Sequence, residues 1–197
     1  MKKIWIVAVA TSFAFSVNAQ DSGVETQAIG VIIDAHALVD VVDDEIIFDF
    51  SADDPSEAGS PFVLGTNKNQ NTHLNYSLML SNGGMADGTI SVRITDMNEG
   101  MHMTLLADGT PAASLDQNTY GTLGTVAANF DATQGASPVI LSSTDQILIE
   151  NIGSSYTGNG TGNGYQLLYT AHINDYSKLD ADNGAQDMGT ITYTVAE

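Results

Sequence analysis

The stretch Tyr165-Gln-Leu-Leu-Tyr-Thr-Ala-His-Ile173 carries the clearest structural signal in the chain. Its odd-numbered positions are all apolar or aromatic, whereas Gln166, Thr170 and His172 are polar. Successive side chains of a strand point to opposite faces of a sheet, so a period of two predicts a strand with one buried face. The Tyr and Ile residues of this stretch are also common in strands.

The same alternation recurs on both sides of this stretch. It is present in residues 31–41, 46–50, 74–80, 90–94, 101–105 and 191–195, and short apolar runs occupy 139–141 and 147–149. Asn-Gly and Asp-Gly pairs, which suit tight turns, separate several of these segments. No window longer than one turn has the apolar spacing of a helix. The sequence therefore predicts an all-β, antiparallel β-sandwich of Ig-like or jelly-roll type, with about eight to nine strands.

The first residues have the three parts of a secretory signal. Met1-Lys-Lys3 is positively charged, residues 4–17 are mainly apolar, and Val17-Asn-Ala19 suits cleavage before Gln20. An N-terminal membrane anchor is the alternative, but the apolar run is shorter than a spanning helix needs. We therefore expect a signal peptide at 1–19, a flexible N-terminal arm at 20–30 and a single sandwich domain at 31–197. The localisation expected is secreted, extracellular or on a bacterial cell surface.

The charge balance excludes several classes of function. The chain of 197 residues has 24 Asp and Glu against 5 Lys and Arg, a formal net charge of −19. Removal of the signal would leave Lys68, Arg93 and Lys178 as the strong cations, and the net charge would become −21. A nucleic-acid partner is excluded because such proteins need Lys and Arg to displace phosphate counterions. With no cysteine, disulfides and thiolate metal sites are excluded too. No apolar run of the mature chain is long enough for a transmembrane segment.

Asp180 and Asp182 are the candidate metal ligands. In Asp180-Ala-Asp-Asn-Gly184 the carboxylates are two residues apart before a glycine, as at the start of a calcium loop. The EF-hand pattern fails, because its twelfth position is Ile191 and not Glu. An acidic hairpin turn is the alternative interpretation. Calcium is therefore a possible cofactor, and a further acidic group at residues 40–45 could bind it or form a solvated edge.

The sequence does not predict an enzyme. Four histidines lie in different predicted strands without chelating spacing, so no transition-metal site is expected (His36, His73, His102 and His172). There is no Gly-x-Ser-x-Gly elbow, and a carboxylate-based hydrolase is only a third hypothesis. The glycine-rich stretch 158–164 lacks the lysine of a phosphate loop, and we interpret it as a hairpin connection.

The two ends of the domain suggest an assembly mechanism. A long alternating segment, Ile29–Val42, opens the domain, and another, residues 189–197, closes it. A terminal strand can pair with an open sheet edge of a neighbouring copy, and head-to-tail repetition builds a filament. Pairing of both ends within their own sandwich is the alternative. The predicted subunit interface consists of Ile29, Val31, Ile33, Ile191, Tyr193 and Val195.

The chain resembles small secreted all-β bacterial proteins of uncharacterised type. The resemblance covers most of the mature chain and rests on patches such as residues 31–41, 73–77, 163–169 and 190–195. In layout it loosely resembles fimbrial, pilin-type major subunits, with a glycine, Gly184, fourteenth from the end. It departs from them at Ala196, where a penultimate Tyr is usual, and in lacking the usual disulfide.

The resemblance implies a secreted or cell-surface structural protein, a pilin-like or extracellular-matrix filament subunit involved in adhesion. Such a subunit self-associates by β-strand complementation, so its expected partner is a second copy of the chain. The alternative is a secreted calcium- or glycan-binding β-sandwich module.

Overall fold

The computed structural model describes residues 29–43, 45–50, 57–60, 68–81, 86–109, 121–179 and 189–197. The chain divides into two compact units, residues 1–33 and residues 34–197. Residues 29–33 are the described part of the first unit, and every strand of the described residues lies in the second unit. Asp180 and Asp182, the candidate calcium ligands, lie outside the described residues.

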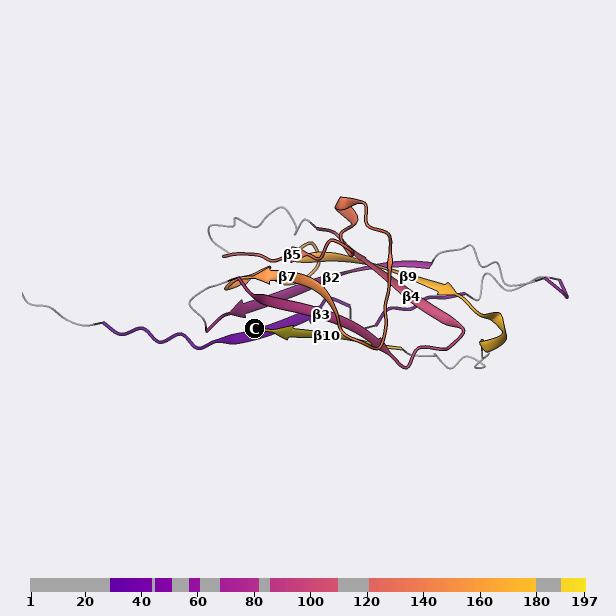
Figure 1. Cartoon of the computed structure of the whole chain (residues 1–197), viewed down its shortest axis with the longest axis horizontal. Coiled ribbons are helices and arrows are strands. Elements are labelled where there is room, and N and C mark those ends of the chain that lie inside the picture. The colour runs from indigo at the N-terminus through magenta and orange to yellow at the C-terminus, as the bar shows by residue number, and fades with distance from the viewer. Residues whose placement is uncertain are drawn as a thin grey trace, which may run out of the picture. The chain divides into compact units, whose positions relative to one another are not determined.

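Two antiparallel sheets pack against each other and form a β-sandwich, as predicted (Figure 1). The first, sheet A, has the order β1 (His36–Val41), β2 (Lys68–Met79), β9 (Tyr165–Ile173), β4 (Met101–Ala107) and β6 (Val139–Ile140), and β8 (Ser155–Tyr156) also pairs with β2. The second, sheet B, has the order β10 (Thr190–Ala196), β3 (Gly88–Thr95), β7 (Gln146–Ile152) and β5 (Thr125–Val126).

The helical content of the described residues is confined to short 3-10 turns, among them η2 (Ala132–Gln134) and η3 (Tyr176–Lys178). No helix in these parts of the chain is long and apolar enough to span a bilayer. The described residues contain ten strands, more than the eight to nine predicted; β6 coincides with the predicted run 139–141, whereas β5 and β8, each two residues long, were not predicted. Such short strands leave no detectable period in a sequence.

The core is built from the alternating positions of the central strands. In β9, Tyr165, Leu167, Tyr169 and Ala171 are all buried, whereas the neighbouring Gln166 is exposed. β3 alternates in the same way, with buried and half-buried residues in strict succession. The period of two in the sequence therefore predicted the buried face of β9 and of β3, whereas in the central strand β7 the adjacent Leu148 and Ile149 are both buried.

Two predicted strands differ from the structure. The first alternating segment becomes a strand only at His36, and residues 29–35 are not assigned to a strand. Residues 45–50 are also outside the strands, although Ile46 and Phe48 pack against the core as their alternation predicted. Alternation reports which side chains are buried, whereas a strand also requires a neighbouring backbone in register.

Candidate functional site: an open edge and an outer groove

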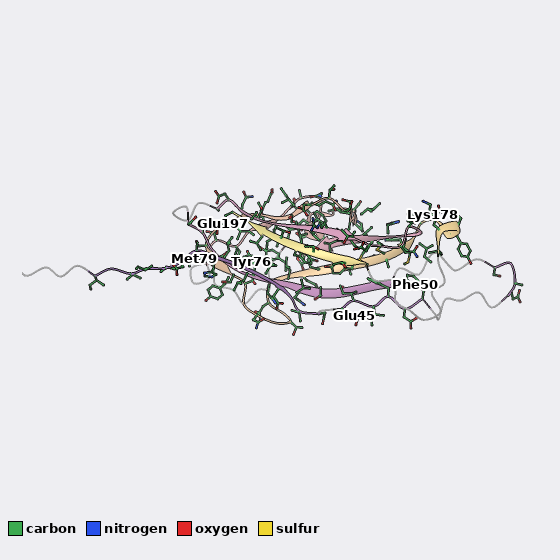
Figure 2. The ribbon with its side chains drawn as sticks, turned by 90° about the horizontal axis from the view of Figure 1, so that it is seen from below. Glu45, Phe50, Tyr76, Met79, Lys178 and Glu197 are labelled. Atoms are coloured by element: carbon green, nitrogen blue, oxygen red, sulfur yellow. The ribbon has the colours of Figure 1, made fainter. Side chains whose placement is uncertain are left out.

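Edge strands β1 and β10 lie against each other on one side of the sandwich. β1 is the edge of sheet A and pairs with β2, and β10 is the edge of sheet B and pairs with β3. At one end of the sandwich, Met79 of β2 lies near Glu197, which follows β10 (Figure 2). There the Ser81 hydroxyl donates to the Glu197 carboxylate at 3.4 Å. We call the side formed by β1 and β10 the open edge.

The core-facing side chains of the open edge are incompletely covered. They pack against the core but remain only partly buried, and they are Val39, Val41, Ile191, Tyr193 and Val195. In the adjacent β3, by contrast, Ile90 and Val92 have no exposed surface. On the opposite side, β5, the loop after it and the end of β6 contribute the buried side chains of Val126, Phe130 and Leu141, whereas Leu123 and Val139 are partly buried. Among the described residues, the apolar side chains of the open edge are therefore less covered than those of the central strand β3.

The predicted interface residues fall into two groups. Ile29, Val31 and Ile33 are 85%, 78% and 69% exposed, and Ile32 beside them is 91% exposed. Ile191, Tyr193 and Val195 are the core-facing residues of β10. In water such a run of exposed Ile and Val is unfavourable, since each side chain gains about 1.5–3 kcal/mol on burial.

Tyr193 ties the open edge to the opposite sheet. Its hydroxyl is hydrogen-bonded to the hydroxyl of Tyr169 in β9. Burial raises the pKa of Tyr169 to about 12, and burial followed by the Tyr169 interaction raises the pKa of Tyr193 well above its ordinary value. Both phenols are therefore neutral at physiological pH, and the pair is a structural contact between the sheets.

An open groove of about 390 Å³ lies on the outer face of sheet A. Its floor is the stretch of β2 around Asn75 and Ser77, whose outward side chains alternate with the core residues Leu74, Tyr76 and Leu78. One wall is β1, with Leu38 and Asp40. The other is β8 and the loop after it, with Tyr156 and Asn159.

The glycine-rich loop 158–164 forms part of that second wall and is tied to β2. With its amide oriented to satisfy both groups, Asn75 donates to the Asn163 carbonyl at 3.0 Å and accepts from the Gly160 N–H at 3.2 Å. The Asn163 amide in turn donates to the Asn159 carbonyl at 2.7 Å. Gly164 has φ +70°, and a Cβ there would clash with the Leu74 carbonyl oxygen. The loop joins β8 to β9, but these strands do not form a hairpin, because both pair with β2 and not with each other. The prediction of a connection is therefore right, whereas the prediction of a hairpin is wrong.

Two of the four histidines meet across sheet A. His102 of β4 and His172 of β9 are register partners, with ring centroids 4.9 Å apart and planes 15° from parallel. The other two lie elsewhere on β1 and β2, and His36 Nε2 is 3.2 Å from the Ser77 hydroxyl. In the described parts of the chain no three His, Asp or Glu side chains gather as metal ligands would. The His pair was missed because its two residues are 70 positions apart in the sequence, and only strand register brings them together.

Asp131 is a buried carboxylate, but both of its oxygens already accept hydrogen bonds from within its own loop. It accepts from the Thr133 N–H, the Thr133 hydroxyl and the Gln134 amide at 2.6–2.8 Å, and caps η2. The Thr133 hydroxyl lowers the pKa of Asp131 most strongly, and the Gln134 amide and two backbone N–H groups lower it further. The geometry assigns Asp131 to holding the loop and not to proton transfer.

Comparisons with protein-family models, with curated proteins and with solved structures found no match.

Proposed function

We propose that the chain is a secreted or cell-surface structural subunit, of a pilin-like or matrix filament, which self-associates by β-strand complementation. The observation that carries the proposal is the partial burial of the core-facing side chains of β1 and β10 among the described residues, together with an exposed Ile29–Ile33 segment in the same chain. The proposed partner is a second copy, because the chain itself carries both an exposed apolar segment with the alternation of a strand and an edge whose described apolar side chains are only partly buried.

The spacing of the apolar side chains in the Ile29–Ile33 segment matches that in β10, and this match supports the proposal. In a strand, residues 29, 31 and 33 share one face at intervals of about 6.6–6.8 Å. The core-facing residues of β10 at 191, 193 and 195 have the same interval. A segment from one copy could therefore place its three side chains against the partly buried row of another copy. Its backbone would pair with β1 or β10, each of which pairs with one strand only among the described residues.

Side-chain burial alone does not account for association of two copies. Burying three Val and Ile side chains contributes about 5–9 kcal/mol, whereas association costs roughly 4–15 kcal/mol in lost translational and rotational freedom. Main-chain hydrogen bonds along the edge strand are then what decides the affinity. Complementation should therefore depend on both the apolar face and the extended backbone of the segment.

Two adjacent substitutions test the proposal on the exported full chain. Val31→Asn alters the face shared with Ile29 and Ile33, whereas Ile32→Asn makes the same chemical change on the opposite face. Both side chains are exposed, so neither variant should lower the melting temperature. We expect oligomers or filaments for the parent chain and for Ile32→Asn, and monomers for Val31→Asn, by light scattering and electron microscopy. A monomeric parent chain, or equal association of both variants, would contradict the proposal.

A further inference from the structure

We propose that the groove on the outer face of sheet A binds a neutral saccharide. The site would be a second function of the same chain, and it does not depend on strand complementation. Its groups come from β1, β2, β8 and the loop 158–164, so it exists within one copy.

Two apolar walls face each other across one strand. Leu38 of β1, Ser77 of β2 and Tyr156 of β8 form a cross-strand row, because Ser77 is the register partner of both of the others. Leu38 is 65% exposed and Tyr156 is 43% exposed. Two strand spacings separate them, about 9.5 Å, with the small Ser77 side chain between, and the Ser77 hydroxyl lies 3.2 Å from His36 Nε2. This leaves room for a ring whose C–H faces contact the leucine on one side and the tyrosine on the other.

Polar groups surround this apolar slot. Asp40 lies next to Leu38 along the same wall and is the register partner of Asn75, and Asn159 reaches the groove from the loop. A carboxylate accepts hydrogen bonds, and an amide both donates and accepts. A ligand with apolar C–H faces and a rim of hydroxyl groups matches this combination, and a saccharide has both.

The backbone of β2 at the floor of the groove is already hydrogen-bonded on both sides, which favours a saccharide ligand over a peptide. Around Ser77, β2 is hydrogen-bonded to β1 on one side and to β8 on the other. An extended peptide normally binds a sheet by adding a strand to a free edge. The groove offers side chains on a closed stretch of sheet, so recognition there has to use side chains.

Charge narrows the saccharide to a neutral one. The lining residues include the Asp40 carboxylate and no lysine or arginine, and the whole chain has a formal net charge of −19. An acidic sugar would be repelled by the Asp40 carboxylate in the groove and by the negative electrostatic potential of the whole protein. The wall formed by the loop is also held in place before binding, by the Asn75 hydrogen bonds to Asn163 and Gly160.

The test is calorimetric titration of the full chain with cellohexaose, laminarihexaose, mannohexaose and chitohexaose, with an oligogalacturonate as the acidic comparison. We expect saturable binding of at least one neutral oligosaccharide and none of the acidic one. Tyr156→Ala should weaken binding about tenfold or more, which corresponds to ~1.4 kcal/mol. Tyr176→Ala is the matched control, because Tyr176 is similarly exposed, at 53%, and lies in η3 outside the groove.

Leu38→Ser provides a second wall variant if Tyr156→Ala is poorly folded, and it should weaken binding in the same way. The titration is repeated with the wall variants combined with Val31→Asn, which is expected to keep the chain monomeric. A loss of saccharide binding is then measured independently of a loss of self-association. The proposal is overturned if none of the four neutral oligosaccharides binds. It is also overturned if Tyr156→Ala and Leu38→Ser bind as well as Tyr176→Ala, or if only the acidic oligosaccharide binds.

Discussion

Tyr169 of β9 and Tyr193 of β10 are hydrogen-bonded through their hydroxyls, which joins a central strand of sheet A to the edge strand of sheet B. The contact fixes β10 against the core at the side where the core-facing side chains of β1 and β10 are only partly buried. An edge strand held in this way can keep its outer backbone edge available for another strand.

Replacing both tyrosines of this pair should cost less than the sum of the two single replacements. Tyr169→Phe or Tyr193→Phe leaves one largely buried hydroxyl without its partner, which costs about 1–3 kcal/mol. In the double variant neither hydroxyl is left unpaired, so the loss should be smaller than the sum of the two single losses. Urea unfolding of the four proteins measures this coupling. Strictly additive losses would show that the hydrogen bond contributes little.

High pH should unfold the protein through its buried tyrosines. Burial raises the pKa of Tyr169 to about 12, and it is also the main cause of the raised pKa of Tyr76, Tyr165 and Tyr193. In the unfolded chain a tyrosine ionises near pH 10. The folded state thus holds these protons more tightly, so stability is fully present below about pH 10 and falls as pH rises toward about 12.

Tyrosinate absorbance followed together with circular dichroism checks this alkaline transition. We expect the buried tyrosines to ionise in the same step in which the sheet signal is lost. Ionisation of all tyrosines near pH 10 in a folded chain would contradict the prediction.

Low pH should destabilise the folded chain by protonating the stacked histidine pair. Partial burial lowers the pKa of His102, and repulsion from His172 lowers it further. At pH values below about 6.5 the unfolded chain therefore takes up this proton more readily, and stability falls as pH decreases through that range. His172→Gln should raise the pKa of His102 in an NMR titration, because it removes the second cause. His73→Gln, on β2 outside the pair, is the control and should leave the pKa of His102 unchanged.

Alanine substitutions at two glycines of the loop 158–164 distinguish the cost of backbone strain from the cost of a steric clash. Gly164 and Gly160 both have positive φ, +70° and +83°, so alanine costs about 1–2 kcal/mol at either position. At Gly164 the new Cβ would also clash with the Leu74 carbonyl oxygen, whereas at Gly160 nothing lies within 4 Å. Gly164→Ala should therefore lower the melting temperature clearly more than Gly160→Ala. Equal effects would mean that the loop moves away from β2 without cost.

Self-association should require salt. A formal net charge of −19 makes copies of the chain repel one another, and the screening length falls from about 30 Å at 0.01 M salt to about 8 Å at 0.15 M. We expect light scattering by the parent chain to increase with sodium chloride over this range. Stronger association at the lower salt concentration would contradict strand complementation between such acidic subunits.

Sequence periodicity predicted local features well. In residues 165–173 it identified both the strand and its buried face, because alternation is a property of the extended backbone itself. It also identified Ile46 and Phe48 as core-facing, although that segment is not a strand. The His102–His172 pair and the Leu38–Ser77–Tyr156 row were beyond its reach, since each joins residues from strands far apart in the chain.

The sequence by itself determined the class of fold and the direction in which the side chains of the central strands point. Only the tertiary structure decided which strands are neighbours, that β1 and β10 are the partly covered edges, and that β1 and β8 flank β2 to form a groove. The physical reason is that side-chain alternation follows from the geometry of each short segment. Strand order and register depend instead on how all the apolar faces can be buried together, which no single segment of the sequence specifies.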